Sequence, residues 1–473
     1  MAKGKGKKGF GSYLLVLLLA IVATFLIIIT VMLFSPFKSI LGFEYFTYSE
    51  NQIILTENGG NESSPLNFEN SEININCSFA NVKIARSNKI DSYAFRFENY
   101  TSGFARDDHD TDFSYEVYYT DDSKTEINVD VHEPEGFLFF NKNITISILV
   151  STKLDQNALS NSKLNIINTD GNIYVGNKTK VLNVEDQTKN YLTIGDLNVK
   201  TNEGKIVVFP YINESIKNLF LKSANGDIEV RRNLNVTERC EIYGNSGEYE
   251  FKTLTVSGTT PAKFDLGHGE LSAESIVANV ELSIKDGYID IDKFNGTLSS
   301  NDAVYQMSSA NISIVEFTGN LSLPYVNKSK VTLGTVNAGS QIYIHSTEGN
   351  IRIKDSKADV IKIETTKGNV NVKTSGKDID VKTTSGNINV IFEGNQLSNQ
   401  ISLQAKSGDV KFKVNPEFAF LLKVYNSRGE GRTDGKVNVE GYDELESNEI
   451  KINNGESKIV TISTNGAISV GLN

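Results

Sequence analysis

The feature of this 473-residue chain that most constrains its fold is a short motif that recurs about every 20 residues. Each copy contains a polar pair, a glycine, usually an asparagine or aspartate, and then alternating apolar and polar residues. A fixed period of this length indicates a repeat architecture, in which each unit contacts only its neighbours. The clearest copies are TDGNIYV around Gly171, ANGDIEV around Gly226, TEGNIRI around Gly349, TKGNVNV around Gly368, TSGNINV around Gly386 and KSGDVKF around Gly408.

The motif predicts two short β-strands per repeat, joined at a corner. Alternating apolar and polar residues favour strands, and glycine permits the positive φ that a tight corner needs. A two-strand unit cannot bury its own aliphatic face, so successive units must stack as the coils of a parallel β-helix, or β-solenoid. A β-sandwich has strands at similar spacing and is the alternative, but the recurring corner motif favours the solenoid. Looser copies of the motif surround Gly204, Gly247, Gly287 and Gly466.

The motif also predicts which side chains form columns along the stack. We expect the apolar residue after each corner to face inward, at Ile173, Ile228, Ile351, Val370, Ile388 and Val410. The corner residues themselves should fall in register, so that asparagine amides hydrogen-bond to one another while stacked aspartates require solvent or a cation. These corner residues are Asn172, Asp227, Asn350, Asn369, Asn387 and Asp409.

The repeats are expected over residues 161–473, and a different β region is expected before them, over 68–160. Residues 113–120 alternate aromatic and polar side chains, and TEINVDV follows a four-residue polar turn, which predicts an antiparallel hairpin. The segment ITISILV supplies a further strand at residues 144–150. The C-terminal sequence TISTNGAISVGLN restores the motif and is expected to form the last coil.

The N-terminus carries a long apolar segment. No charged residue occurs from Gly9 to Phe37, and residues 13–34 are long enough to cross a hydrocarbon core of about 30 Å as a helix. A cleavable signal peptide is the alternative, but its apolar part is shorter and ends at small residues. We therefore expect a transmembrane helix over 13–34, a Lys-rich tail over 1–12 and a juxtamembrane spacer over 35–67.

The charge distribution predicts an orientation and a class of partner. Four lysines lie within the first eight residues, so the positive-inside rule places the N-terminus in the cytoplasm and the C-terminal domain outside it. Without these four, 43 of the 47 basic residues remain against 58 acidic ones, a balance of −15. Such a surface should repel nucleic acid. The expected partners are a lipid bilayer, through residues 13–34, and a surface glycan or protein ligand.

A search for chemical sites finds no catalytic, cofactor-binding or metal-binding set. Only Cys77 and Cys240 occur, which leaves one long-range disulfide open. The four histidines stand in no paired spacing, and surface roles are expected for them. The stretch RDDHDTD could hold a hard cation, but it lacks EF-hand spacing and favours a solvated acidic loop. The histidines are His109, His132, His268 and His345, and the acidic loop holds Asp107, Asp108, Asp110 and Asp112.

Eleven N-x-S/T sequons suit an exposed glycoprotein, provided that the host modifies asparagine. Asn, Ser and Thr are abundant throughout the chain, so a similar number could arise by chance. The sequons are Asn61, Asn76, Asn99, Asn143, Asn177, Asn213, Asn235, Asn295, Asn311, Asn320 and Asn327.

The repeated SGN and SGD strings make the chain resemble the DUF4097 family of adhesin-like bacterial β-solenoid domains, over about residues 68–473. ITISILVSTKLD stands where that family has a strand leading to a Pro-Lys pair, although Thr152 precedes Lys153 here in place of proline. TSGNINV is close to the family's rung pattern. The resemblance implies a β-solenoid at the cell surface or envelope, often with a membrane anchor, and it brings no catalytic residues.

We therefore expect a membrane-anchored, extracytoplasmic, non-enzymatic protein that acts in adhesion or as a scaffold. A glycan-binding or glycan-cleaving β-helix is the first alternative, and an envelope stress sensor with membrane partners is the second. The oligomeric state stays open.

Overall fold

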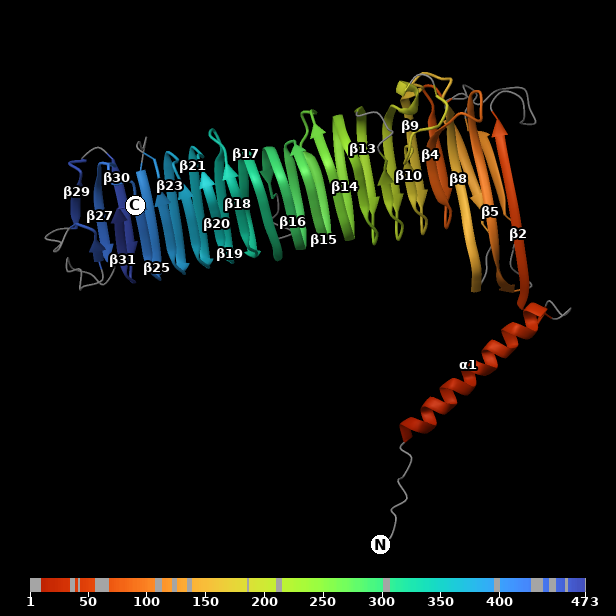
Figure 1. The fold of residues 1–473 in the computed structure, drawn as a ribbon, viewed down its shortest axis with the longest axis horizontal. Helices are drawn as coiled ribbons and strands as arrows, with labels where there is room; N and C mark the ends of the chain where they lie inside the picture. Colours follow the sequence, from red (N-terminus) through yellow and green to blue (C-terminus); the bar gives the residue numbers. More distant parts are fainter. Residues whose placement is uncertain are drawn as a thin grey trace, which may run out of the picture.

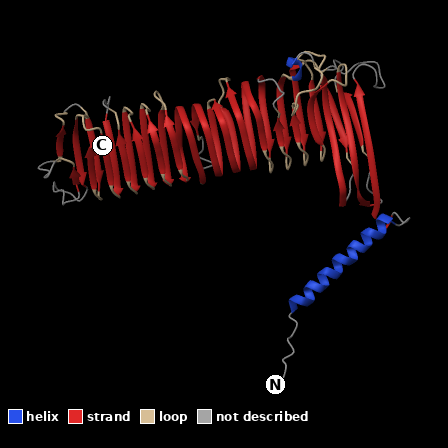
Figure 2. Cartoon of the chain, viewed as in Figure 1, coloured by secondary structure: helices blue, strands red, loops and turns tan. Residues whose placement is uncertain are grey.

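The computed structural model describes most of the chain as a single elongated stack of β-strands, with one α-helix projecting from one end (Figures 1 and 2). Within the described ranges there are 31 strands, so the all-β expectation is confirmed. The described residues are 10–34, 39–40, 43–55, 68–106, 113–120, 126–133, 138–184, 187–209, 215–300, 307–394, 400–426, 437–441, 448–455 and 458–472.

Helix α1 (Phe10–Phe34) occupies the segment predicted to span a membrane, and its described side chains, such as Leu17 and Ile21, are exposed. In the part of the chain that the structure describes, no helix meets both the length and the apolar character that a membrane crossing requires. The predicted anchor is therefore not confirmed. Within the predicted spacer, residues 43–55 form a long strand that belongs to the stack.

Each coil of the stack contributes one strand to each of two sheets, which we call sheet 1 and sheet 2. Neighbouring coils pair in parallel: β21 (Val360–Lys367) lies between β19 (Gln341–Glu348) and β23 (Asp378–Ser385) in sheet 1. This parallel pairing confirms the β-solenoid. The other strands of sheet 1 are β6 (Ser114–Tyr119), β7 (Glu126–His132), β3 (Glu72–Cys77), β9 (Leu159–Asn168), β11 (Ile194–Thr201), β13 (Ser215–Ser223), β25 (Gln400–Ser407), β30 (Ile459–Thr464), β27 (Phe420–Asn426) and β29 (Glu449–Ile452).

Sheet 2 is built in the same way from the second strand of each coil. In the middle of the stack the chain runs through both sheets as single long strands that turn at the corner: β14 (Ile228–Val256), β15 (Ala262–Val277), β16 (Val280–Ser299) and β17 (Ser309–Lys328). The remaining strands of sheet 2 are β1 (Ser39–Ile40), β2 (Phe43–Leu55), β5 (Tyr93–Arg106), β8 (Leu138–Ser151), β4 (Asn81–Ser87), β10 (Ile173–Val175), β12 (Ile206–Val208), β18 (Val331–Val336), β20 (Ile351–Ser356), β22 (Val370–Thr374), β24 (Ile388–Phe392), β26 (Val410–Val414), β31 (Ile468–Leu472) and β28 (Val437–Val439).

The core lies between the two sheets and runs the length of the stack. The predicted inward column is confirmed, because Ile351, Val370, Ile388 and Val410 are successive Cα partners in sheet 2 and none is exposed. Each coil buries a few aliphatic side chains against the coils on both sides, so stability comes from stacking, since one coil alone leaves these faces in water.

The corner glycines are required by two constraints at once. Gly386 has φ of +150°, and a Cβ built on it would lie 2.0 Å from the carbonyl oxygen of Gly368 in the preceding coil. Gly368 stands in the same relation to Gly349, at 1.9 Å. The coils therefore approach each other so closely at the corner that no side chain fits there.

The corner asparagines and aspartates fall in register, but the predicted amide-to-amide bonding is wrong at these positions. The Oδ1 atom of Asn369 accepts the backbone N–H of Asn387 at 2.8 Å, and that of Asn387 accepts the backbone N–H of Asp409 at 2.8 Å. Asp409 continues the series to Ala467 at 2.9 Å. Only a side-chain oxygen is used, so aspartate serves as well as asparagine and needs no cation.

The first end of the stack is closed by antiparallel strands. The predicted hairpin is confirmed, since β6 and β7 pair antiparallel, and β7 then lies against β3 at the edge of sheet 1. In sheet 2, β5 pairs antiparallel with both β2 and β8. After the hairpin the chain folds back, so that β7 and β8 form an outer coil beside β3 and β4. The pairs β3–β7 and β4–β8 are parallel, and the parallel stack therefore begins at this outer coil.

The other end of the stack does not finish with the C-terminus. Strand β30 pairs in parallel with β25 on one side and β27 on the other, and β31 lies between β26 and β28. The C-terminal segment is therefore inserted between earlier coils, and the expectation that it forms the last coil is wrong. Figure 1 shows the C-terminus beside β25, with β27 and β29 beyond it. The motif identified a coil correctly, but it carries no information on spatial order.

Candidate functional site

A ladder of asparagine side chains crosses the outer face of sheet 1 near its first end. Asn128, Asn74, Asn165 and Asn198 occupy successive strands, β7, β3, β9 and β11. The amide of Asn74 donates to Asn128 at 3.1 Å, that of Asn165 to Asn74 at 2.8 Å, and that of Asn198 to Asn165 at 3.1 Å. Amide-to-amide bonding along the stack therefore exists on this flat face, and not between the corner asparagines Asn369 and Asn387.

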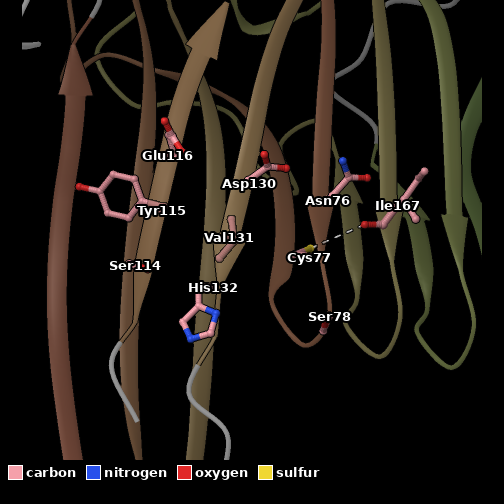
Figure 3. Close-up of a pocket in the computed structure, with 10 residues that line it drawn as sticks. All are labelled: Asn76, Cys77, Ser78, Ser114, Tyr115, Glu116, Asp130, Val131, His132 and Ile167. Carbon is pink, nitrogen blue, oxygen red and sulfur yellow. Dashed lines mark hydrogen bonds between the residues drawn. The ribbon is translucent and has the colours of Figure 1, made fainter. Parts of the chain in front are cut away.

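A groove of about 660 Å³ lies beside this ladder, where β6, β7, β3 and β9 run next to one another (Figure 3). The ladder and the groove share the strands β7, β3 and β9, because outward-facing residues of successive coils stand in rows. Ten residues line the groove: Asn76, Cys77, Ser78, Ser114, Tyr115, Glu116, Asp130, Val131, His132 and Ile167.

The groove is rich in hydrogen-bond acceptors. Glu116 and Asp130 are Cα partners in the hairpin, and Asp130 is the partner of Asn76 in β3, so these polar side chains form one row. The hydroxyl of Tyr118 donates to Asp130 at 2.6 Å, and this hydrogen bond raises the pKa of Tyr118. Carboxylates accept and amides donate, so the row can bind a ligand with several hydroxyl or amide groups.

The ring of Tyr115 lies on the side of the hairpin that faces the core, opposite to the polar row, because Tyr115 alternates with Glu116 along β6 and has Val131 as its Cα partner. The ring of Tyr115 stacks on that of Phe97, with centroids 3.8 Å apart and an angle of 4° between the planes. Phe97 itself is fully buried, so the tyrosine ring is held by the core. His132 ends β7 and lies exposed in the lower part of the groove in Figure 3.

The two cysteines do not supply a reactive thiol or a disulfide. Both are buried and free, so the disulfide left open by the sequence does not form. Burial raises the pKa of Cys77 far above its ordinary range and raises that of Cys240 to about 12. The thiolate is the nucleophilic form, so Cys77 cannot act as a nucleophile near neutral pH although it lines the groove.

The described residues contain no group of three His, Cys, Asp or Glu side chains that could hold a metal ion. The acidic stretch with Asp107, Asp108, His109, Asp110 and Asp112 lies outside the described residues. Of the other histidines, His268 contacts Asp286 at 2.6 Å and His345 contacts Glu364 at 3.4 Å, both on the surface. The expected surface role is confirmed for these two. His345 and Glu364 border a second groove of about 440 Å³ on sheet 1.

The sequons differ in accessibility. Asn99 is 3 % exposed and accepts a hydrogen bond from the hydroxyl of Thr101, so a glycan cannot be attached there in the folded protein. Asn61 and Asn213 lie outside the described residues. Of the sequon asparagines that the structure describes, four are exposed, namely Asn76, Asn143, Asn295 and Asn320.

Sequence reasoning did not find the groove or the ladder. The signal was present, because EININ, KLNII and DLNVK each place an asparagine between inward apolar residues. The rows could only be aligned once it was known that β7 folds back beside β3, since this pairing joins residues that are 54 positions apart.

The fold and the groove define an elongated, two-sheet parallel β-solenoid with a polar groove on sheet 1. The Toastrack DUF4097 family matches residues 70–316 and again residues 290–471. The chain therefore belongs to this family, and the resemblance in the repeats is confirmed. No curated protein is similar to the chain at a significant level.

Three solved structures share low similarity with the chain, and each covers 90 % of it. A candidate cell adhesion protein from Clostridium sporogenes ATCC 15579 is 10 % identical, with a TM-score of 0.18 and 99 % of its own length covered. A candidate adhesin from Bacteroides fragilis NCTC 9343 is 10 % identical, with a TM-score of 0.17 and 97 % covered. A candidate adhesin from Parabacteroides distasonis ATCC 8503 is 9 % identical, with a TM-score of 0.16 and 97 % covered.

Proposed function

We propose that this protein is a non-enzymatic, membrane-anchored, extracytoplasmic protein that acts in adhesion or as a scaffold. The observation that carries the proposal is the unbroken stack of coils. It begins at β2, which follows α1 closely in the chain, and it continues without a break in the parallel pairing between β9 and β26. A rigid array of this kind supports presentation of a polar surface at a distance from an attachment point.

The anchoring part of the proposal rests on the sequence of residues 13–34, because the described residues contain no helix that qualifies as a membrane span. Protease treatment of intact cells tests it. We expect a C-terminal tag on the full chain to be removed from outside and an N-terminal tag to be protected. Protection of the C-terminal tag, or release of the chain by carbonate extraction, would contradict the proposal.

A second candidate function is glycan binding in the groove beside the asparagine ladder. The row of Glu116, Asp130 and Asn76 supports it, because a sugar offers several hydroxyl groups that can donate to carboxylates and accept from an amide. Glycan-array binding of the full chain in detergent tests this function. We expect Asp130→Asn to reduce binding at least tenfold.

Asp265→Asn is the matched control for this test. Asp265 occupies the same outward row of sheet 1, on β15, several coils from the groove, so its substitution should leave glycan binding unchanged. Equal glycan binding by the wild-type and Asp130→Asn chains would contradict a binding site in the groove. Release of reducing sugar from any bound glycan would overturn the non-enzymatic part of the proposal.

A further inference from the structure

The outer face of sheet 2 carries charges of opposite sign on the two sides of a line between β17 and β18. Asp290 on β16, Ser313 on β17, Thr332 on β18 and Arg352 on β20 are successive Cα partners. An acidic residue therefore stands three strands from a basic one, with two small polar residues between them.

The two neighbouring rows repeat this arrangement. In one row, Asp292 and Lys354 stand at the ends, on either side of Val315 and Gly334. In the next row the signs are exchanged, because Lys293 on β16 and Asp355 on β20 enclose Glu316 and Thr335.

Reversing the order of strands about the line between β17 and β18 thus places the outer charges of the three rows on charges of opposite sign: Asp290 on Arg352, Asp292 on Lys354 and Lys293 on Asp355. Glu316 falls on the uncharged Thr335. One coil further out on each side, the same reversal places Glu274 on β15 opposite Lys373 on β22.

These side chains are available to a partner. Asp290, Asp292, Arg352 and Lys354 are all exposed, and the structure gives none of them an ion pair with another described residue. The acidic side chains border a hollow of about 380 Å³ and the basic ones a hollow of about 490 Å³. Between the hollows, Val315 is 54 % exposed.

We propose that a second copy of this chain docks on sheet 2, face to face and antiparallel, about a twofold axis that runs along the strands between β17 and β18. This operation turns β16 of one copy onto β20 of the other and β17 onto β18. Asp290 then faces Arg352 and Asp292 faces Lys354, each twice, as an isologous interface requires. Val315 of each copy faces Gly334 of the other, where no side chain obstructs it.

The extent of this surface predicts a weak, salt-sensitive dimer. Six strands spaced by about 4.8 Å, with five residues of each in contact, cover roughly 500 Å² per copy. This is at the lower limit of the area that specific interfaces bury. The charged pairs remain near solvent, so they contribute more to orientation and specificity than to affinity, and salt screens them.

The antiparallel arrangement places the two β2 ends at opposite ends of the pair. If each copy is attached through α1, which is the part that rests on the proposed function, the two attachment points lie on opposite sides. The pairing would then join two surfaces and not two neighbours on one surface. Dimerisation in detergent does not require attachment, so a failure of anchoring and a failure of pairing give different results.

A charge exchange tests the pairing. Sedimentation velocity on the full chain in detergent should show a dimer that dissociates as salt is raised. The variant Asp290→Lys/Asp292→Lys and the variant Arg352→Glu/Lys354→Glu should each lose at least tenfold in association constant, because like charges then face each other. An equimolar mixture of the two variants should restore the dimer, since every facing pair is again of opposite sign.

Two further variants keep the test specific. Lys362→Glu/Lys406→Glu makes the same change of charge on the outer face of sheet 1, and it should leave the dimer intact. Val315→Arg alters an exposed side chain at the axis and should weaken the dimer without affecting the unfolding temperature. A monomeric wild-type chain at low salt, or a mixture of the two charge variants that stays monomeric, would overturn the proposal.

Discussion

At the scale of single residues, two features of the corner determine how one coil packs on the next. A side-chain oxygen of the corner asparagine or aspartate accepts a backbone N–H from the following coil, and the missing Cβ of the corner glycine lets the two backbones approach. These roles explain why glycine is kept at the corner, whereas asparagine and aspartate interchange. The second fact needs coordinates, because the sequence does not show which atom of the side chain is used.

Gly386→Ala should destabilise the protein by about 3 kcal/mol, because alanine opposes the positive φ and its Cβ would overlap the carbonyl oxygen of Gly368. Urea unfolding monitored by circular dichroism measures the change. Gly471→Ala is the control, since its Cβ would meet no atom closer than 3.4 Å. Equal stability of the two variants would show that the corner tolerates a side chain.

Two substitutions at Asn387 test whether its side chain acts only as a hydrogen-bond acceptor. Asn387→Asp keeps Oδ1 and should change the free energy of unfolding little, whereas Asn387→Ala leaves the N–H of Asp409 without its partner and should cost about 1 kcal/mol. The same urea titration compares them. A greater loss for the aspartate variant than for the alanine variant would contradict the acceptor role.

At the scale of elements, the outer coil at each end of the stack is out of chain order. β7 and β8 lie outside the earlier strands β3 and β4 at one end, and β27 and β28 lie outside the later strands β30 and β31 at the other. Antiparallel strands, β5 and β29, then lie against the outer coils. This arrangement limits the amount of parallel edge that is open to further pairing.

Glu133 secures the corner of the first coil, and its titration is a test of that contact. Its carboxylate accepts the backbone N–H groups of Ser78, Phe79 and Ala80, at 3.2, 2.5 and 3.0 Å. Burial nevertheless raises the pKa of Glu133 above its ordinary value of 4.5. A carboxyl group whose pKa is raised on folding contributes stability that is present below the unfolded pKa and is lost as pH rises through the folded pKa.

The stability of the wild-type chain relative to Glu133→Gln should therefore fall as pH rises from about 4 toward neutrality, and then become constant. Urea unfolding at a series of pH values gives this difference directly. A difference that increases over the same interval would mean that the three backbone N–H donors outweigh burial, so that the pKa is lowered.

Removal of β30 and β31 should unfold the far end of the stack and not merely shorten it. β27 pairs in parallel with β30 and not with β25, and β28 pairs in parallel with β31. A chain ending at Ser457 therefore leaves β27 and β28 without a parallel neighbour, and β29 paired with β27 alone. Limited proteolysis should then cleave rapidly within residues 415–457. Unchanged protection of this region would indicate that the C-terminal segment is the outermost coil.

The sequence predicted the elements that obey a local rule and missed those that depend on spatial order. The inward column at Ile351 and Val370 and the hairpin at residues 113–132 follow from periodicity within a few residues, and both were confirmed. The insertion of β30, the β3–β7 pairing and the groove around Asp130 depend on which distant strands lie side by side. The spacing of residues along the chain does not show which distant strands pair.

At the scale of the whole molecule, two matches to one family form one continuous body. The matches overlap at residues 290–316, where β16 and β17 pair in parallel as elsewhere in the stack. A second copy of the domain therefore lengthens the stack instead of adding a separate globule. The line between β17 and β18, about which the charges of sheet 2 reverse, lies just beyond this overlap.

In-register stacking of parallel coils is the central claim, and a distance between nitroxide labels at Tyr343 and Thr461 tests it most directly. The two residues are 118 positions apart, but the pairings of β19, β21, β23, β25 and β30 put them in one row. Four strand spacings predict roughly 19 Å between their backbones. Double electron–electron resonance on the chain with both buried cysteines replaced by alanine should give a narrow distribution near that value. A broad distribution, or one centred well beyond 30 Å, would contradict the stacked order of these coils.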